Sequence, residues 1–223
     1  IGDLSAAPVA IGQNVGAAMS SGLNWDSITE ITKSGSTATY AGDASKSSGS
    51  VTLRYQKVWS GKTWIMDRTI TYVYPQDYFT DRYSVTIPAG NTDPVMLVSS
   101  GDSAPGGSDT GRGIYNSSPV RMIGSYVTSA NFPDGFIVGM REIAGGDQFS
   151  GATEGVYSTV NPLAKTTLYS SFTANTSSHD VGNVVQFSLG STPGVVTRTF
   201  EQFTMAGGIT ANASFASSSA AIG

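Results

Sequence analysis

The chain of 223 residues contains no cysteine and a single histidine, His179. The lack of cysteine excludes a disulfide framework, a thiol nucleophile and every cysteine-based metal centre. A metal site that needs two imidazole ligands is excluded by the single histidine. A chain without thiols is compatible with an extracellular location, which is what we expect here.

Charged residues are also scarce. Asp, Glu, Lys and Arg make up 13% of the chain, against roughly 25% in an ordinary soluble domain. The 12 Lys and Arg residues are scattered and the net charge is -4, so we expect no nucleic-acid partner. No apolar run approaches the roughly 20 residues that span a bilayer, so we also expect no membrane span.

Apolar and polar residues alternate with a period of two along most of the chain, as in strands with one buried face. The clearest stretch, residues 51–74, has turn residues at Ser60 and Gly61 and predicts a long antiparallel hairpin. We expect the buried face of this hairpin to consist of Val51, Leu53, Tyr55, Trp64, Met66, Ile70, Tyr72 and Tyr74.

Other strands are predicted between clusters of Gly, Pro, Asn, Asp and Ser. They cover residues 83–87, 94–99, 120–128, 135–141, 155–160, 166–173, 183–189 and 195–205. This pattern predicts an all-β fold: one large antiparallel β-sandwich of Greek-key or jelly-roll type, formed by residues 1–223 as a single domain. The sequence favours at most a short helical turn within residues 14–25, where two glycines weaken the helical pattern.

A glycine-rich loop, GGSDTGRG at residues 106–113, follows a predicted strand. It matches a nucleotide-binding P-loop until Arg112 replaces the expected Lys and Gly113 replaces the hydroxyl residue that holds magnesium. Pro119 and a run of strand formers occupy the place of the helix that such a loop needs. We therefore expect no nucleotide site.

The same loop carries oxygen ligands of the kind that calcium prefers, with carboxylates at Asp102 and Asp109 and hydroxyls at Ser103 and Ser108. The alternative is that these residues only form tight turns. The spacing matches no EF-hand and no nonapeptide repeat. Calcium at Asp102 and Asp109 is the one cofactor that the sequence suggests, and both interpretations stay open.

Candidates for catalysis are few. His179 and Asp180 are adjacent, so on a strand they point to opposite faces, and no G-x-S-x-G elbow is present. We expect His179 to lie in a surface loop. Pairs of carboxylates suitable for glycoside hydrolysis have no anchoring motif, although Glu30, Glu142, Glu154 and Glu201 are available. The sequence therefore indicates a protein that is not an enzyme.

Aromatic residues are frequent around the predicted hairpin. Trp64 and Tyr72 share the parity of its apolar face and are expected in the core. Trp59, Tyr78, Phe79 and Tyr83 are less constrained by the pattern, and an exposed set of this kind can stack on sugar rings. These four residues are the candidate glycan contacts.

Both ends of the chain show strand-like alternation outside the apparent domain. Within residues 1–20 the apolar positions are Val9, Ile11 and Val15. Within residues 208–223 they are Ile209, Ala211, Ala213 and Phe215. Each segment either pairs within its own sheet, adds as a strand to the edge of a neighbouring copy, or is a mobile tail.

Residues 83–203 resemble β-sandwich domains of large secreted and cell-surface, adhesin-like proteins of bacteria. The resemblance rests on Leu189 and Gly190, on the turn residues Pro193 and Gly194, and on the Thr-rich strand of residues 197–203. It implies an extracellular adhesive or structural role and assigns no catalytic residue. We accordingly expect a structural subunit that assembles with copies of itself by edge-strand addition. The alternatives are a carbohydrate-binding module and a viral coat or tail protein.

Overall fold

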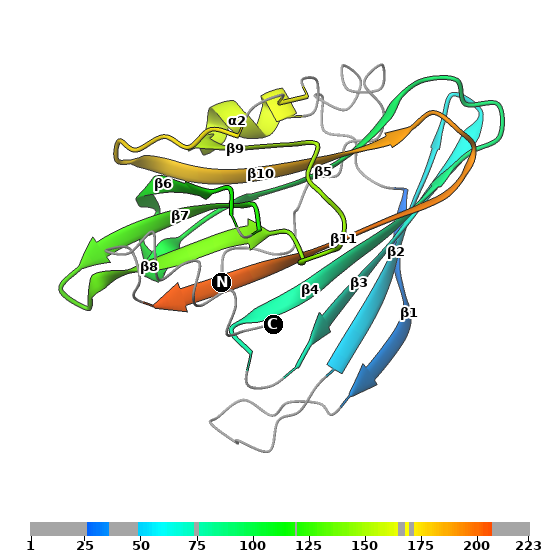
Figure 1. The fold of residues 1–223 in the computed structure, drawn as a ribbon. Coiled ribbons are helices and arrows are strands. Elements are labelled where there is room, and N and C mark those ends of the chain that lie inside the picture. Colours follow the sequence, from blue (N-terminus) through cyan, green and yellow to red (C-terminus); the bar gives the residue numbers. More distant parts are fainter. Residues whose placement is uncertain are drawn as a thin grey trace.

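The computed structural model describes residues 26–35, 49–73, 76–118, 120–164, 168–169 and 172–206 (Figure 1). Strands make up most of this part of the chain. The elements are β1 Ser27–Gly35, β2 Gly49–Trp59, β3 Lys62–Tyr72, β4 Tyr78–Ile87, β5 Val95–Asp102, the 3-10 turn η2 Pro105–Gly107, β6 Thr110–Asn116, β7 Met122–Ser129, β8 Phe132–Arg141, β9 Gly151–Val156, α2 Tyr157–Ala164, β10 His179–Gly190 and β11 Gly194–Ala206. The predicted all-β antiparallel fold is confirmed. Within this part of the chain, no helix has the length and apolar character needed to cross a membrane.

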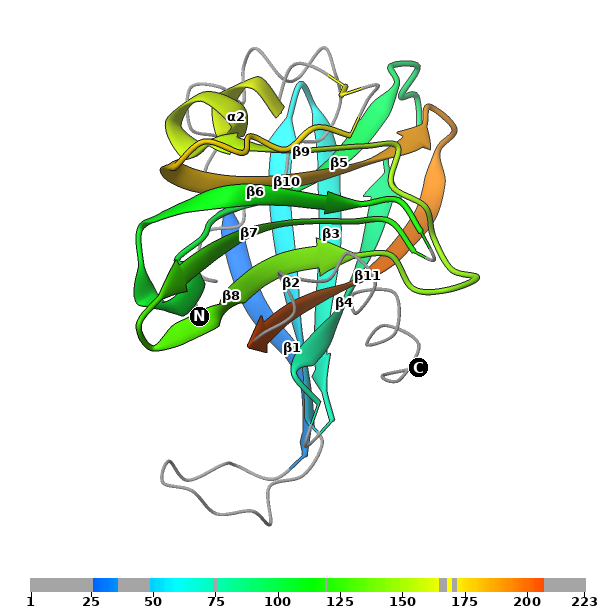
Figure 2. The ribbon, with the colours of Figure 1, turned by 60° about the vertical axis from the view of Figure 1, so that its left-hand side comes forward.

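The strands pair antiparallel in the order β1-β2-β3-β4-β11-β8-β7-β6-β10-β5, and β9 pairs with the free side of β10. The contact between β6 and β10 involves only two residue pairs. Figure 2 shows that β1 to β4 run at a steep angle to the strands from β6 to β10, so the sheet folds over on itself. The inner sides of β3 and β4 thereby face β5 and β10, and the main core lies between them.

The hairpin predicted over residues 51–74 is confirmed as β2 and β3, with a turn at Ser60 and Gly61. Both turn residues have positive φ, 50° and 71°, the backbone that a two-residue hairpin turn requires. Trp64 and Met66 are buried as expected. Tyr72 is not a core residue: it lies at the end of β3 and is 38% exposed.

Two strand predictions differ from the structure. Residues 157–164 form α2, although a strand was expected over residues 155–160. Val160 of α2 packs on Met96, Val98 and Val184, so the helix covers the outer face of β5 and β10. Packing of this kind stabilises a helix whose sequence is a weak helix former. In the described part of residues 166–173, only Thr173 makes a β contact, a single bridge to Thr153.

Strands β1 and β6 overlap no predicted strand, and β9 shares only residues 155 and 156 with the strand expected over residues 155–160. β6 carries Gly111 and Gly113 and so lacks apolar alternation. A side chain at Gly111 would lie 2.7 Å from the carbonyl oxygen of Tyr126 on β7, so close strand packing requires glycine there. The glycine-rich loop is thus a turn that leads directly into a strand.

Several predictions lie outside the described residues. They are the helical turn within residues 14–25 and the terminal assembly strands with Val9, Ile11, Val15, Ile209, Ala211, Ala213 and Phe215. A single domain over residues 1–223 also stays a prediction.

Candidate binding pocket

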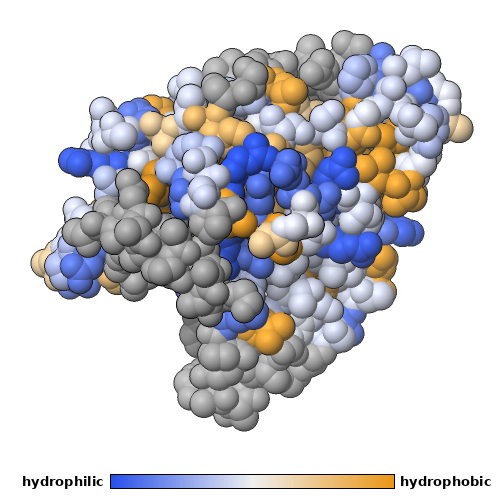
Figure 3. Space-filling model, viewed as in Figure 1, coloured by the Kyte–Doolittle hydropathy of each residue, from blue (hydrophilic) through white to orange (hydrophobic). Residues whose placement is uncertain are grey.

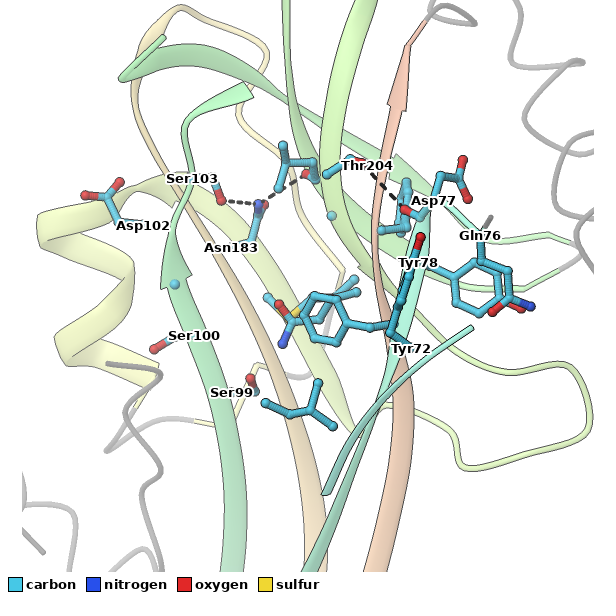
Figure 4. A pocket seen from close by; sticks show the side chains of 18 residues that line it. Tyr72, Gln76, Asp77, Tyr78, Ser99, Ser100, Asp102, Ser103, Asn183 and Thr204 are labelled. Carbon is cyan, nitrogen blue, oxygen red and sulfur yellow. Dashed lines mark hydrogen bonds between the residues drawn. The ribbon is translucent and has the colours of Figure 1, made fainter. Parts of the chain in front are cut away.

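The two layers separate at one end of the core and leave a pocket of about 530 Å³, a volume typical of small-molecule sites. Side chains from both layers line it (Figure 4). Ser99, Ser100 and Ser103 lie along β5 and the residue after it, and Tyr72 and Tyr78 lie on the opposite side. The pocket therefore forms where residues distant in sequence meet.

A buried ion pair lies next to the pocket. Arg68 is 3% exposed and Asp81 is fully buried, and Arg68 Nη2 donates to Asp81 Oδ2 at 2.6 Å. The hydroxyl of Tyr83 donates to the same oxygen at 3.1 Å, and Gln202 Nε2 does so at 2.8 Å. Burial raises the pKa of the Tyr83 hydroxyl, and the Asp81 charge raises it further, so this hydroxyl stays a donor.

Amide and hydroxyl groups form one wall of the pocket. Asn183 on β10 is 2% exposed, and its Nδ2 donates to Ser103 Oγ at 2.7 Å. Its Oδ1 accepts from Ser125 Oγ at 3.1 Å. These bonds fix the orientation of the amide, so this wall is rigid before any ligand binds.

Aromatic side chains form the opposite side. Tyr78 and Phe79 are half-buried at the start of β4. The Arg141 guanidinium lies 4.9 Å from the centre of the Tyr78 ring and pairs with Glu201 at 2.6 Å. The residue before Tyr78, Asp77, accepts a backbone hydrogen bond from Thr204 at 2.9 Å. Tyr78 is therefore held in place by groups behind it.

The four candidate glycan contacts do not form one surface. Tyr83 is wrong as a glycan contact, because it is fully buried and stacks on Phe200 at 5.9 Å. Trp59 pairs with Lys62 at the start of β3, whereas Tyr78 follows the far end of that strand. At about 3.3 Å per residue, an eleven-residue strand separates them by roughly 30 Å. Only Tyr78 and Phe79 line the pocket.

The carboxylates of Asp102, Asp109 and Asp180 meet beside the pocket, with one oxygen of each within 4.8 Å of the others. Sequence reasoning named the first two and missed Asp180, because β10 brings it to the loop only through its pairing with Thr110. Burial raises the pKa of Asp102, and the charges of Asp180 and Asp109 raise it further. Calcium at Asp102 and Asp109 stays a prediction.

The expected surface-loop histidine is instead the first residue of β10, and its side chain is 7% exposed. His179 Nε2 lies 2.8 Å from Oε1 of the fully buried Glu154 side chain. Glu154 Oε2 accepts from the backbone N–H of Asn175 at 2.8 Å. Burial raises the pKa of Glu154. Glu154 lies on β9 and His179 on β10, so the burial and the pairing of these two side chains depend on the contact between the two strands. The local sequence pattern therefore gave no indication of this pair.

Three of the four glutamates considered for hydrolysis have internal partners. Glu142 binds Arg121 at 2.6 Å, Glu154 binds His179 and Glu201 binds Arg141. Glu30 lies exposed on β1. None of the four lies among the described residues that line the pocket.

The chain matches no protein-family model and no curated protein. The function is therefore argued from the pocket.

Proposed function

We propose that this protein is an extracellular, non-catalytic binding module that holds a carbohydrate in the open end of the sandwich. The observation that carries the proposal is the pocket itself, where Tyr72 and Tyr78 lie across from Ser103 and Asn183 of the other layer (Figure 4) and Phe79 is a further lining residue. Sugar rings offer apolar faces for aromatic stacking and hydroxyls for hydrogen bonds, so they match both sides of such a site.

The chemistry of the lining supports binding more than catalysis. Among the described lining residues the only acidic side chains are Asp77 and Asp102, and none is Lys, Arg or His. Asp77 follows the β3 strand and Asp102 ends β5, on the two sides of the pocket (Figure 4). The carboxylates most removed from water, Asp81 and Glu154, are committed to Arg68 and His179.

The first experiment is titration of the protein with a broad panel of soluble glycans by isothermal calorimetry. Tyr72 is half exposed at the pocket, so Tyr72→Ala should keep the fold and weaken the best ligand about tenfold, as expected when one stacking contact of about 1.4 kcal/mol is lost. Val195→Ala truncates an apolar residue that is 67% exposed near the opposite end of β11 and should leave affinity unchanged. No binding across the panel would contradict the proposal.

A second proposal is self-assembly by edge-strand addition, and β1 favours it. β1 ends the described sheet and its described side chains are all exposed, with Ile28 at 58% and Ile31 at 41%. On the face seen in Figure 3, apolar residues are scattered among hydrophilic ones, which favours strand pairing at an edge over association through a flat apolar face.

Electron microscopy and light scattering test this second proposal. Filaments or oligomers of the unchanged protein should disappear when Ile28 and Ile31 are both replaced by Lys, because charge on an edge strand opposes pairing. The matched control is Val195→Lys, an exposed apolar position away from β1. A monodisperse monomer before any substitution would count against assembly.

A further inference from the structure

Gln202 of β11 lies in a row of side chains that crosses the pocket. It pairs with Phe79 on β4 and with Met140 on β8, and Phe79 pairs in turn with Tyr72 on β3. Directly opposed residues on neighbouring antiparallel strands point to the same face, with Cβ atoms about 4.5–5.5 Å apart. All four residues line the pocket. Gln202 therefore presents an amide to the pocket between the apolar side chains of Phe79 and Met140.

The amide of Gln202 has a fixed orientation. Its Nε2 donates to Oδ2 of Asp81 at 2.8 Å, and a carboxylate that is paired with Arg68 accepts hydrogen bonds but does not donate them. The NH2 end therefore faces Asp81, and Oε1 is the end directed away from it. Among the described residues, this oxygen accepts no hydrogen bond, and it is not one of the polar atoms that are sealed from solvent without a partner. Oε1 is thus an acceptor open to a donor on a ligand.

A hydroxyl on the other wall of the pocket offers the complementary group. Ser103 is 5% exposed and lines the pocket, and its Oγ accepts from Asn183 Nδ2 at 2.7 Å (Figure 4). Within the described part of the chain, this hydroxyl donates its own proton to no acceptor. A ligand therefore meets an oriented acceptor at Gln202 and a donor at Ser103.

The neighbours of Gln202 restrict the group that carries the donor. A sugar hydroxyl satisfies Oε1, but further hydroxyls packed against Phe79 and Met140 would lose water without gaining a hydrogen bond. An acetamido group combines an N–H donor, a carbonyl acceptor and a methyl group in one small unit. When its N–H is donated to Gln202, its methyl group can pack on the adjacent apolar side chains, where burial of apolar surface is favourable.

We infer that the ligand is a carbohydrate with N-acetylated amino groups, which donates an amide N–H to Gln202 Oε1 and packs the methyl group against Phe79 and Met140. This inference rests on the proposed carbohydrate-binding function and assigns the class of sugar. Gln202 is the specificity-determining residue. Tyr72, in the same row, supplies the aromatic face for the sugar ring.

The test compares three β-1,4-linked trisaccharides by isothermal calorimetry. They are built from N-acetylglucosamine, glucosamine and glucose, so they differ only in carrying an acetamido group, an amino group or a hydroxyl at the same carbon. We expect the acetamido trisaccharide to bind at least about tenfold more tightly than either of the others. Equal or tighter binding of another trisaccharide, or of a panel glycan without acetamido groups, overturns the inference and leaves the proposed function standing. Failure of every saccharide overturns the proposed function itself.

Two variants test the contacts separately. Gln202→Met replaces the amide by an apolar side chain of similar size and should weaken the acetamido trisaccharide about tenfold. Because this substitution also removes a donor from Asp81, circular dichroism checks that the variant is folded. Met140→Gln places a polar group where the methyl packs and should remove most of the preference for the acetamido trisaccharide over the glucose one.

The matched control is Met205→Gln, because Met205 packs against a different cluster of side chains and does not line the pocket. It should leave both affinities within about twofold of those of the unchanged protein. An unchanged preference in the Gln202→Met protein, or an equal loss of preference in the Met205→Gln protein, overturns the inference.

Discussion

Gln202 joins the pocket to the buried charge pair beside it: its side chain lines the pocket, while its Nε2 donates to Oδ2 of Asp81 at 2.8 Å. Asp81 therefore accepts hydrogen bonds from Arg68, Tyr83 and Gln202, which lie on three adjacent strands. A fully buried carboxylate requires such a set of donors, because each lone pair left without a partner costs free energy. The shape of the pocket and the stability of the core are thus coupled through Asp81.

Replacing the buried carboxylate should strongly destabilise the fold. Asp81→Asn leaves the Arg68 guanidinium buried without a counter-charge, so the free energy of unfolding should fall by about 3–5 kcal/mol. Urea denaturation measures the change. The matched control is Asp67→Asn, which breaks the pair with Arg54 at 2.7 Å on the partly exposed outer face and should cost less than about 1 kcal/mol. Similar effects of the two substitutions would contradict this account.

Gly113 should tolerate no side chain. A Cβ atom there would lie 1.8 Å from Oε2 of Glu154 and 2.8 Å from the backbone nitrogen of Asn175, so the Glu154–His179 pair would have to move. Gly113→Ala is expected to lower the free energy of unfolding by about 2–4 kcal/mol, as steric disruption of a buried polar network does. The matched control is Gly101→Ala, whose added Cβ would meet no atom within 4 Å and should leave the free energy of unfolding nearly unchanged. Urea denaturation of both variants measures the two changes. A stable Gly113→Ala protein would show that the pair is not rigid.

Repulsion among the three carboxylates should make stability depend on pH. The pKa of Asp102 is raised above its ordinary 3.8, first by burial and then by Asp180 and Asp109. A raised pKa means that the folded protein binds this proton more tightly than the unfolded chain, so the contribution is present below pH 3.8 and is lost as the pH rises through the raised value.

Asp109→Asn should therefore stabilise the protein at neutral pH by a few tenths of a kcal/mol, a small effect because these charges are exposed and screened. The gain should vanish near about pH 3, where Asp102, whose pKa is raised, is protonated and no longer repels Asp109. Chemical denaturation at the two pH values measures it. A gain of equal size at both would assign the effect to something other than charge.

Calcium binding predicted from Asp102 and Asp109 can be tested at the same cluster. If the ion binds, calcium at about 1 mM should raise the melting temperature of the unchanged protein, since a ligand of the folded state stabilises it. Asp109→Asn should abolish the rise, and magnesium at the same concentration should produce a smaller one. An unchanged melting temperature with calcium would mean that Asp102 and Asp109 only form tight turns.

Local sequence features predicted the β2–β3 hairpin, because the parity of Trp64 and Met66 and the turn at Ser60 and Gly61 are properties of neighbouring residues. They failed at α2 and at β6. In α2, contacts of Val160 with distant strands stabilise the helix, and in β6 glycines permit close packing instead of marking a loop. The alternation along β3 also places Arg68 on the same buried face as Met66. It does not identify Asp81, the partner whose charge makes the burial of Arg68 tolerable.

The sequence by itself determined that this chain has no thiol chemistry, little charge and an antiparallel β fold, since composition and a period of two require no knowledge of distant contacts. Only the tertiary structure decided where the chemistry lies. It buried Tyr83, separated Trp59 from Tyr78, brought Asp180 to Asp102 and placed Asn183 opposite Tyr72 across the pocket. The physical reason is that the folding of the sheet over on itself, and not the order of residues along any strand, determines which inward-facing side chains meet.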